Sequence, residues 1–187
     1  SENLNGKRVG VQGIGKVGKH LVELLVKEDA KVFITDISEH NLKQVSEFYG
    51  CDIVATDDFY ETPMDIYAPC ALGATLNTEN IEKLKCDIVA GCANNQLAKE
   101  SVHGQMLMDK GILYAPDFLI NAGGLINVYS ELTGYNRQRA MDSTTRIYDV
   151  TLDILKKSKE DKIPTYVAAK QIASDRIRSI KNVRSTY

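Results

Sequence analysis

Three glycines, Gly13, Gly15 and Gly18, have the spacing that most clearly suggests binding chemistry in this sequence. They follow the apolar run 8–12, which predicts a strand, and they precede a segment of helical spacing. In such a unit the first glycine permits a tight turn, the second lets a pyrophosphate approach the backbone, and the third lets helix and strand pack closely. The positive end of the helix dipole then faces the anion. The spacing predicts a pyrophosphate-binding turn, and the alternative is a glycine turn without a ligand.

A carboxylate stands at the end of the second predicted strand, 31–35. Asp36 lies about 20 residues beyond the glycines, where a carboxylate accepts hydrogen bonds from an adenosine ribose. Neither Lys nor Arg occurs in Ile37–Glu39 to accept a 2′-phosphate, which the carboxylate itself would repel. These residues predict NAD rather than NADP as the cofactor. The alternative for Asp36 is a strand-end turn residue or a helix cap.

Asparagines in two later loops could bind uncharged polar groups. Asn94, Asn95 and Asn121 each offer two amide donors and one carbonyl acceptor, which suits a carboxamide or a ribose. Two glycines soon after Asn121 would permit close approach to the backbone there. The alternative for Asn94 and Asn95 is a role in a turn or as a helix cap.

Short apolar runs rich in Val and Ile alternate with segments of helical period along the first two thirds of the chain. This alternation is typical of repeated β-α units, so the sequence predicts an α/β fold with a doubly wound, mostly parallel sheet of Rossmann type. From Gly123 the pattern is helical, which predicts a helical C-terminal tail. The expected strands are 8–12, 31–35, 52–55, 64–68, 86–90 and 112–115. Expected helices follow the glycines and span 39–49, where Leu42, Val45 and Phe48 repeat, and about 78–84, 101–109, 137–159 and 166–183.

Composition excludes several classes of protein. Against 25 acidic residues there are 23 Lys and Arg among 187, so no basic excess favours nucleic acid as a partner. Charged or polar residues interrupt every apolar run before the roughly 18 to 20 residues of a membrane span, and the N-terminus lacks the pattern of a signal peptide. We therefore expect a soluble, cytoplasmic protein without a membrane partner. Its histidines share no metal-site spacing, and its cysteines are expected to be reduced and buried: Cys51, Cys70, Cys86 and Cys92.

Several segments together resemble the glutamate, leucine, phenylalanine and valine dehydrogenase superfamily, and most closely its leucine dehydrogenase branch. The resemblance runs from about Asn5 to the end of the chain. The segments that carry it are 6–18, 68–73, 91–97, 114–127, 134–137 and 163–169.

The resemblance implies a role for each matching residue. The residues from Gly13 to Lys19 would hold the pyrophosphate, and Asn121 would bind the nicotinamide carboxamide. It implies cofactor contacts at Gly13, Ile14, Gly15, Lys16, Val17, Gly18, Lys19, Asp36, Ile37, Cys70, Ala71, Leu72, Ala93, Asn94, Asn95 and Asn121. Leu125 and Val128 match positions that line an aliphatic substrate pocket, with plain helix core as the alternative.

The resemblance also implies an activity: reversible oxidative deamination of a branched-chain L-amino acid, with leucine favoured, to its 2-oxo acid, ammonia and NADH. Residues 1–187 would form the NAD-binding domain, with C-terminal helices from about 135. No segment like the family's glycine-rich catalytic lysine motif occurs, so we expect the amino-terminal catalytic domain to be absent, no catalytic residue or metal ligand in this chain, and no turnover by the chain alone. The full-length enzyme is expected to be a homo-oligomer. The alternatives are a non-catalytic nucleotide-sensing domain and a dehydrogenase of another substrate class.

Overall fold

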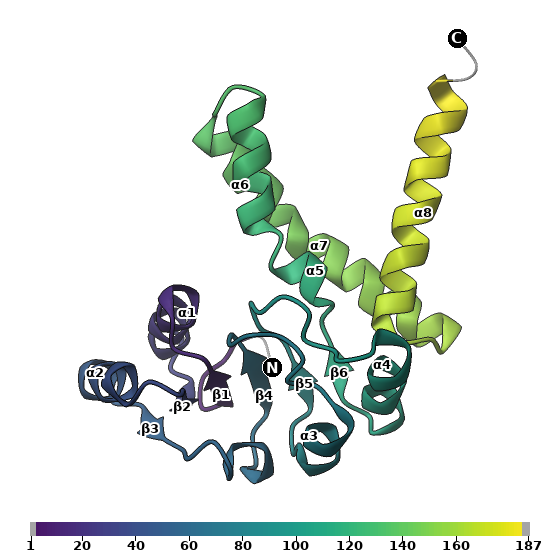
Figure 1. Ribbon diagram of the computed structural model, residues 1–187. Helices are drawn as coiled ribbons and strands as arrows, with labels where there is room; N and C mark the ends of the chain where they lie inside the picture. Colours follow the sequence, from purple (N-terminus) through teal and green to yellow (C-terminus); the bar gives the residue numbers. More distant parts are fainter. Residues whose placement is uncertain (1–2, 185–187) are drawn as a thin grey trace. The chain divides into compact units, whose positions relative to one another are not determined.

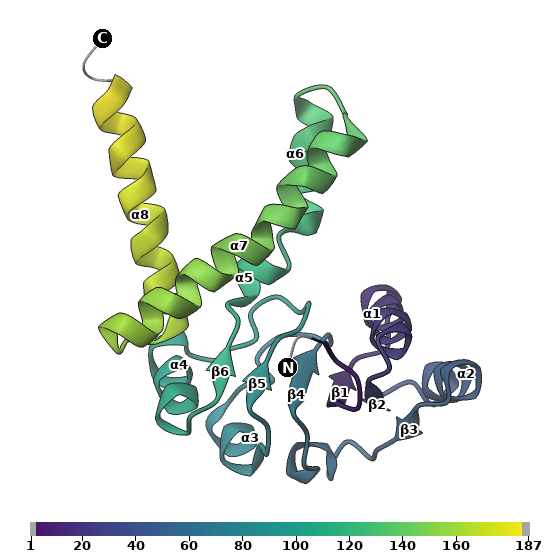
Figure 2. The same cartoon turned by 180° about the vertical axis from the view of Figure 1, so that it is seen from behind.

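A six-stranded parallel sheet organises the first part of the chain in this computed structural model, which describes residues 3–184. Its strands are β1 (Arg8–Gln12), β2 (Lys31–Thr35), β3 (Asp52–Ile53), β4 (Ile66–Pro69), β5 (Ile88–Val89) and β6 (Leu113–Tyr114). They lie in the order β3-β2-β1-β4-β5-β6, and every pair is parallel. Figures 1 and 2 show the strands side by side in this order. This is the doubly wound order in which the chain reverses direction across the sheet between β1 and β4.

Alternate residues of each central strand enter different cores on the two faces of the sheet. On β2, Val32 and Ile34 pack with the helices that follow β1 and β2, whereas Phe33 packs on the opposite face. Gly10 on β1 faces the same side as Phe33, and a Cβ there would lie 2.8 Å from the Phe33 ring. Burial on both faces accounts for the continuous apolar runs seen in the sequence, since strands covered by helices on both sides need no polar face.

Four of the helices of this part lie between successive strands, and the fifth follows β6. They are α1 (Lys16–Lys27), α2 (Glu39–Tyr49), α3 (Thr78–Lys83), α4 (Glu100–Asp109) and α5 (Asp117–Ile120), with a 3-10 turn η1 (Phe59–Glu61). Ser38 caps α2 by accepting the Asn41 N–H at 3.3 Å, and Gly50 ends it in the left-handed conformation. Asn77 caps α3 in the same way, through the Asn80 N–H at 2.9 Å. Local capping residues therefore set these helix ends.

The chain divides into two compact units, with the boundary between Asn121 and Ala122. The second unit contains α6 (Gly123–Leu132), α7 (Arg137–Asp161) and α8 (Thr165–Arg184), and α7 contacts both other helices. Asn136 caps α7 by accepting the Arg139 N–H at 2.9 Å. None of the helices in the part of the chain that the structure describes has the length and apolar character needed to cross a bilayer.

The α/β architecture and the helical tail predicted from the sequence are confirmed, and the sheet is entirely parallel within residues 3–184. The predicted strands 52–55, 86–90 and 112–115 are too long, because each pairs over two residues only. Phe48 was placed on the wrong face of α2: it is 76% exposed, whereas Leu42 and Val45 are buried. At 3.6 residues per turn, Tyr49 continues that face better, and Tyr49 packs against the core. Ser1, Glu2 and residues 185–187, on which the signal-peptide and chain-end predictions partly depend, lie outside the described residues.

Candidate functional site

The glycine turn lies at the carboxyl end of β1, beside the point where the strand order reverses. Gly13 has a φ of +97°, and a Cβ there would lie 2.5 Å from the backbone nitrogen of Ala71. A Cβ at Gly18 would lie 1.9 Å from the Gly13 carbonyl oxygen, so helix and turn are in direct contact there. Gly15, by contrast, has open space within 4 Å of the position its Cβ would take. The first and third glycines are therefore required by packing, and the second leaves its backbone accessible.

The start of α1 has the features of an anion site. Gly15 is its N-cap and provides no side-chain cap, and the first turn contains no acidic residue. Lys16 and Val17 are exposed there, and Lys19 is half-buried, with its ammonium donating to Gln44 Oε1 at 3.1 Å. A helix start with accessible N–H groups favours a negative charge through hydrogen bonds and the helix dipole.

Asp36 joins this turn to the end of β2. Its Oδ2 accepts the Ile14 N–H at 2.5 Å, and its Oδ1 accepts the Ser38 N–H at 2.8 Å. The carboxylate is thus held at the mouth of the glycine turn, next to the fully exposed Ile37. Asp36 therefore has the turn role that the sequence offered as an alternative. Each oxygen of an ionised carboxylate still has a further lone pair that can accept from a ligand hydroxyl.

A second pair of loops meets at the carboxyl ends of β4 and β5. A Cβ at Gly73 would lie 2.5 Å from the Asn94 carbonyl oxygen, so the two loops touch backbone to backbone. Ala74 donates its N–H to the Asn95 carbonyl at 2.6 Å, and both residues have positive φ values, +66° and +53°. Such strained left-handed residues recur at binding sites, where the surrounding contacts maintain them. The backbone of Asn95 therefore has the turn role that the sequence offered as an alternative.

Asn94 and Asn121 come together from segments far apart in the sequence. The Asn121 Nδ2 donates to the Asn94 Oδ1 at 2.5 Å, at the end of α5. Asp117, also on α5, accepts the Gln96 N–H at 2.9 Å and so ties the same two segments together. The structure thus brings the predicted asparagines into one polar group at the carboxyl edge of the sheet.

Gln96 was not singled out from the sequence, yet it shapes this loop. Its side chain is fully buried, and its Nε2 donates to the Gly91 and Ala93 carbonyl oxygens at 2.8 and 2.9 Å. Those bonds fold residues 91–96 around the amide, while its Oε1 is buried without a hydrogen-bond partner. Gln96 follows two other amide residues, Asn94 and Asn95, so its residue type alone did not distinguish this role in the sequence.

The predicted site residues fall into two groups. The cofactor residues from Gly13 to Asn121 all belong to the first unit, in the segments that follow β1, β2, β4, β5 and β6. Within it, Leu72 is exposed and Ala93 is buried. Leu125 and Val128 belong to the second unit, where they lie one turn apart on α6 and are 73% and 54% exposed. Neither side chain is in the core of the second unit, and their place in a substrate pocket stays a prediction.

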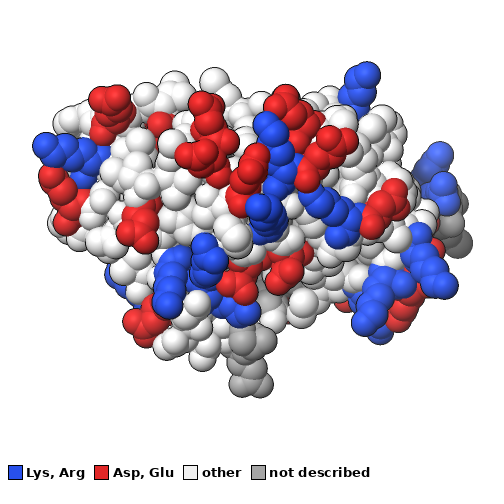
Figure 3. All heavy atoms as spheres, turned by 90° about the horizontal axis from the view of Figure 1, so that it is seen from below, with Lys and Arg blue, Asp and Glu red and all other residues white. Residues whose placement is uncertain are grey.

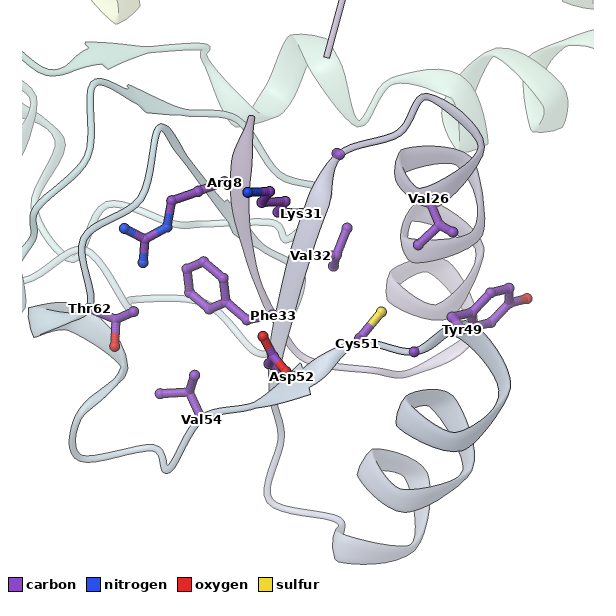
Figure 4. A pocket seen from close by; sticks show the side chains of 12 residues that line it. Arg8, Val26, Lys31, Val32, Phe33, Tyr49, Cys51, Asp52, Val54 and Thr62 are labelled. Carbon is purple, nitrogen blue, oxygen red and sulfur yellow. The ribbon is translucent and has the colours of Figure 1, made fainter. Parts of the chain in front are cut away.

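Other features of the surface carry less chemistry. A hollow of about 440 Å³ opens beside the amino ends of β1 and β2, where Arg8 lies over the Phe33 ring at 5.9 Å (Figure 4). It is at the opposite end of the strands from the glycine turn, whereas ligands of such sheets bind outside the carboxyl ends. On the face displayed in Figure 3, basic and acidic side chains are interspersed. Among residues 3–184 there is no cluster of three or more His, Cys, Asp or Glu that could hold a metal ion.

The residues at the carboxyl edge fit a dinucleotide in three respects. The open backbone at Gly15 and the uncapped start of α1 suit a pyrophosphate, and the Asp36 carboxylate suits a ribose diol. The paired amides of Asn94 and Asn121 suit an uncharged carboxamide.

Comparison with known proteins adds independent information. Residues 33–184 match the family model described as Glutamate/Leucine/Phenylalanine/Valine dehydrogenase. The leucine dehydrogenase of Thermoactinomyces intermedius is 50% identical over 186 residues, covering 100% of this chain and 50% of that protein. The L-tryptophan dehydrogenase of Nostoc punctiforme is 44% identical over 185 residues, covering 99% of this chain and 52% of that protein.

The crystal structure of L-tryptophan dehydrogenase from Nostoc punctiforme is also similar in fold. It matches with a TM-score of 0.95 at 44% sequence identity, covering 97% of this chain and 55% of that chain. This chain spans about half the length of the curated relatives it matches.

Proposed function

The chain belongs to the glutamate/leucine/phenylalanine/valine dehydrogenase family, and from that membership we propose that it is the NAD-binding part of an L-amino-acid dehydrogenase. The observation that carries the proposal is the glycine turn at the reversal of strand order, with the Asp36 carboxylate fixed beside it. A nucleotide-sensing domain would need the turn and the carboxylate only. The Asn94–Asn121 pair at the same edge favours a site that also orients a nicotinamide ring.

In this proposal each part of the cofactor is bound by a different loop at the carboxyl edge of the sheet. Residues Gly13–Lys19 would bind the pyrophosphate through backbone N–H groups, and Asp36 with Ile37 would bind the adenosine ribose. Residues 70–72 and 93–95 would border the remainder of the cofactor, and Asn121 would bind the carboxamide.

NAD is proposed over NADP because of the charge at the ribose position. The Asp36 carboxylate would repel a 2′-phosphate, and Ile37–Glu39 contains no cation to offset that repulsion. Ser38 is engaged as the N-cap of α2, accepting the Asn41 N–H at 3.3 Å.

When bound, NAD supplies the hydride acceptor for oxidation at the α-carbon of an L-amino acid, with water then releasing ammonia and a 2-oxo acid. The residues of this chain would orient the acceptor. The Asn94 Oδ1 accepts from the Asn121 Nδ2, which fixes the rotation of the Asn121 amide and leaves its Oδ1 to accept from a carboxamide N–H. Proton transfer requires an acid–base group. In this family a glycine-rich segment with a lysine carries that group, and these 187 residues contain no such segment. We therefore expect no turnover by these 187 residues alone.

A branched-chain substrate, with leucine favoured, is proposed from two features. Leu125 and Val128 present aliphatic side chains on α6, and leucine dehydrogenase is among the relatives of highest identity. A relative named L-tryptophan dehydrogenase is 44% identical, so the proposal of leucine depends on the side chains of α6 as well as on identity. We further propose that the full-length enzyme is a homo-oligomer.

Substitution of Asp36 tests the cofactor assignment. Asp36→Asn removes the charge and replaces one of the two oxygens that accept backbone N–H groups by an amide nitrogen. We expect NAD to bind about tenfold or more weakly and the preference for NAD over NADP to shrink. Asp109→Asn changes an exposed acidic residue at the end of α4, before the amino end of β6, and is the control that should change neither value. Equal loss of NAD and NADP affinity in the Asp36 variant would contradict the assignment.

A further inference from the structure

Two cysteines lie side by side at the carboxyl ends of β4 and β5. These strands pair Ile66 with Ile88 and Tyr67 with Val89, so continuing the register places Cys70 beside Cys92. Adjacent strands are about 4.7 to 4.9 Å apart, within the range of about 4.4 to 6.8 Å between Cα atoms that a disulfide spans.

The backbone around the pair supports this placement. The Ala93 N–H donates to the Pro69 carbonyl oxygen at 2.9 Å, and a Cβ at Gly91 would lie 2.3 Å from that same oxygen. The thiol and the backbone N–H of Cys92 lie close enough to the Cys70 side chain to affect the pKa of the Cys70 thiol. The two side chains are therefore neighbours, with both thiols free.

The thiol of Cys92 differs in pKa from those of Cys70, Cys51 and Cys86. The neighbouring Cys70 thiol lowers the pKa of Cys92, whereas the Cys92 thiol and burial raise the pKa of Cys70. Burial raises the pKa of Cys51 to about 11 and that of Cys86 to about 12. Because the thiolate is the nucleophile and Cys92 is half-buried rather than enclosed, Cys92 is the thiol most open to attack an electrophile.

We propose that Cys92 is a site of reversible oxidation by hydroperoxides and that Cys70 closes the resulting disulfide. The Cys92 thiolate attacks the peroxide, an S–O bond forms, the O–O bond breaks and the alcohol or water leaves with a proton. The Cys70 sulfur then attacks the sulfenic sulfur, and hydroxide leaves with the Cys70 proton as water. Two thiols lose two electrons and two protons, and one hydroperoxide is reduced.

The disulfide would change the glycine turn, a consequence that rests on the proposed function. A Cβ at Gly13 would lie 2.7 Å from the Cys70 carbonyl carbon, and one at Gly18 would lie 3.5 Å from the Cys70 Cβ. Formation of an S–S bond of about 2.0 Å from two separate thiols moves Cys70 within this tight packing. Oxidation should therefore weaken NAD binding by about fivefold or more, the usual scale of coupling between sites.

The test is peroxide treatment of the full chain, followed by alkylation and tryptic mass spectrometry. Cleavage after Lys and Arg leaves Cys51 and Cys70 together in peptide 44–83, and Cys86 and Cys92 together in peptide 86–99. A Cys51→Ala/Cys86→Ala variant leaves one possible bridge between these peptides, and tandem fragmentation of the linked peptides assigns the bridge in the unmodified chain if that variant is unstable.

The expected result is a dithiothreitol-reversible link between these peptides, which persists in the Cys51→Ala/Cys86→Ala variant and is absent in Cys92→Ser. Calorimetry should give weaker NAD binding after oxidation and recovery after reduction, with Cys92→Ser insensitive to peroxide. Free thiols after treatment, or Cys92 oxidised further without a link, would overturn the disulfide. A link without loss of NAD affinity would overturn its effect on the turn. Failure of the reduced chain to bind NAD would instead count against the proposed function and leave the thiol result standing.

Discussion

Replacing Gly15 by alanine separates ligand binding from folding at the glycine turn. Of the three glycines in this turn, Gly15 is the one at which an added Cβ would meet nothing within 4 Å, and its φ of −75° suits any L-residue. The added methyl group would stand on the backbone that the pyrophosphate is proposed to approach. Gly15→Ala is therefore expected to impair NAD binding in a folded protein.

The two magnitudes follow from this geometry. Alanine is a poorer N-cap than glycine by about 0.5 to 1 kcal/mol, but it lowers the entropy of the unfolded chain, which stabilises by about 0.4 to 1 kcal/mol. The free energy of unfolding should thus change by no more than about 0.5 kcal/mol. Loss of one hydrogen bond to a charged phosphate costs about 1.5 to 3 kcal/mol, which weakens the Kd for NAD about 10- to 150-fold.

Calorimetric titration gives the Kd, and urea unfolding gives the stability. Gly50→Ala is the matched control: Gly50 ends α2 with a φ of +70° and open space around it, remote from the turn. That variant should lose about 1 kcal/mol of stability and keep the affinity of the unmodified chain. Unchanged NAD affinity in Gly15→Ala would refute the claim that the ligand approaches this backbone.

Three further predictions concern stability. Gln96→Met leaves two buried carbonyl oxygens without their donor and should lower the free energy of unfolding by about 2 to 4 kcal/mol in urea titrations. Phe59→Ala empties a fully buried position in the core and should cost about 3 to 5 kcal/mol, seen as a lower Tm. The Arg8 N–H and the Lys7 ammonium lower the pKa of the Asp65 carboxyl. The ionised Asp65 carboxylate therefore stabilises the folded state above the usual carboxyl pKa of about 3.9. This stabilisation is lost as the pH falls through the lower pKa that Asp65 has in the folded protein. Asp65→Asn should reduce the loss of stability in unfolding series below about pH 4, and an unchanged acid dependence would contradict this.

Local signals in the sequence predicted the elements and the glycine turn well. The roles given to Gly13 and Gly18 are confirmed by a positive φ and by a close backbone contact, because both follow from the short-range geometry of a strand-turn-helix unit. The start of α3 at Thr78 was also predicted, because a helix start depends on residues within one turn. The proposed contacts of these residues with a cofactor stay predictions.

Features that depend on contacts between distant segments were not predicted. The adjacency of Cys70 and Cys92 depends on the register of β4 and β5, and a single sequence does not contain that register. The role of Gln96 depends on how the loop folds back on its amide. The exposure of Phe48 likewise depends on which face of α2 meets the sheet.

Titration of the unmodified chain with NAD and, separately, NADP tests the central claim most directly. The arrangement of Asp36 beside the glycine turn predicts saturable binding of NAD with one site per chain, and markedly weaker binding of NADP. Absence of NAD binding, or binding of NADP equal to that of NAD, would contradict the account of this edge of the sheet as an NAD site.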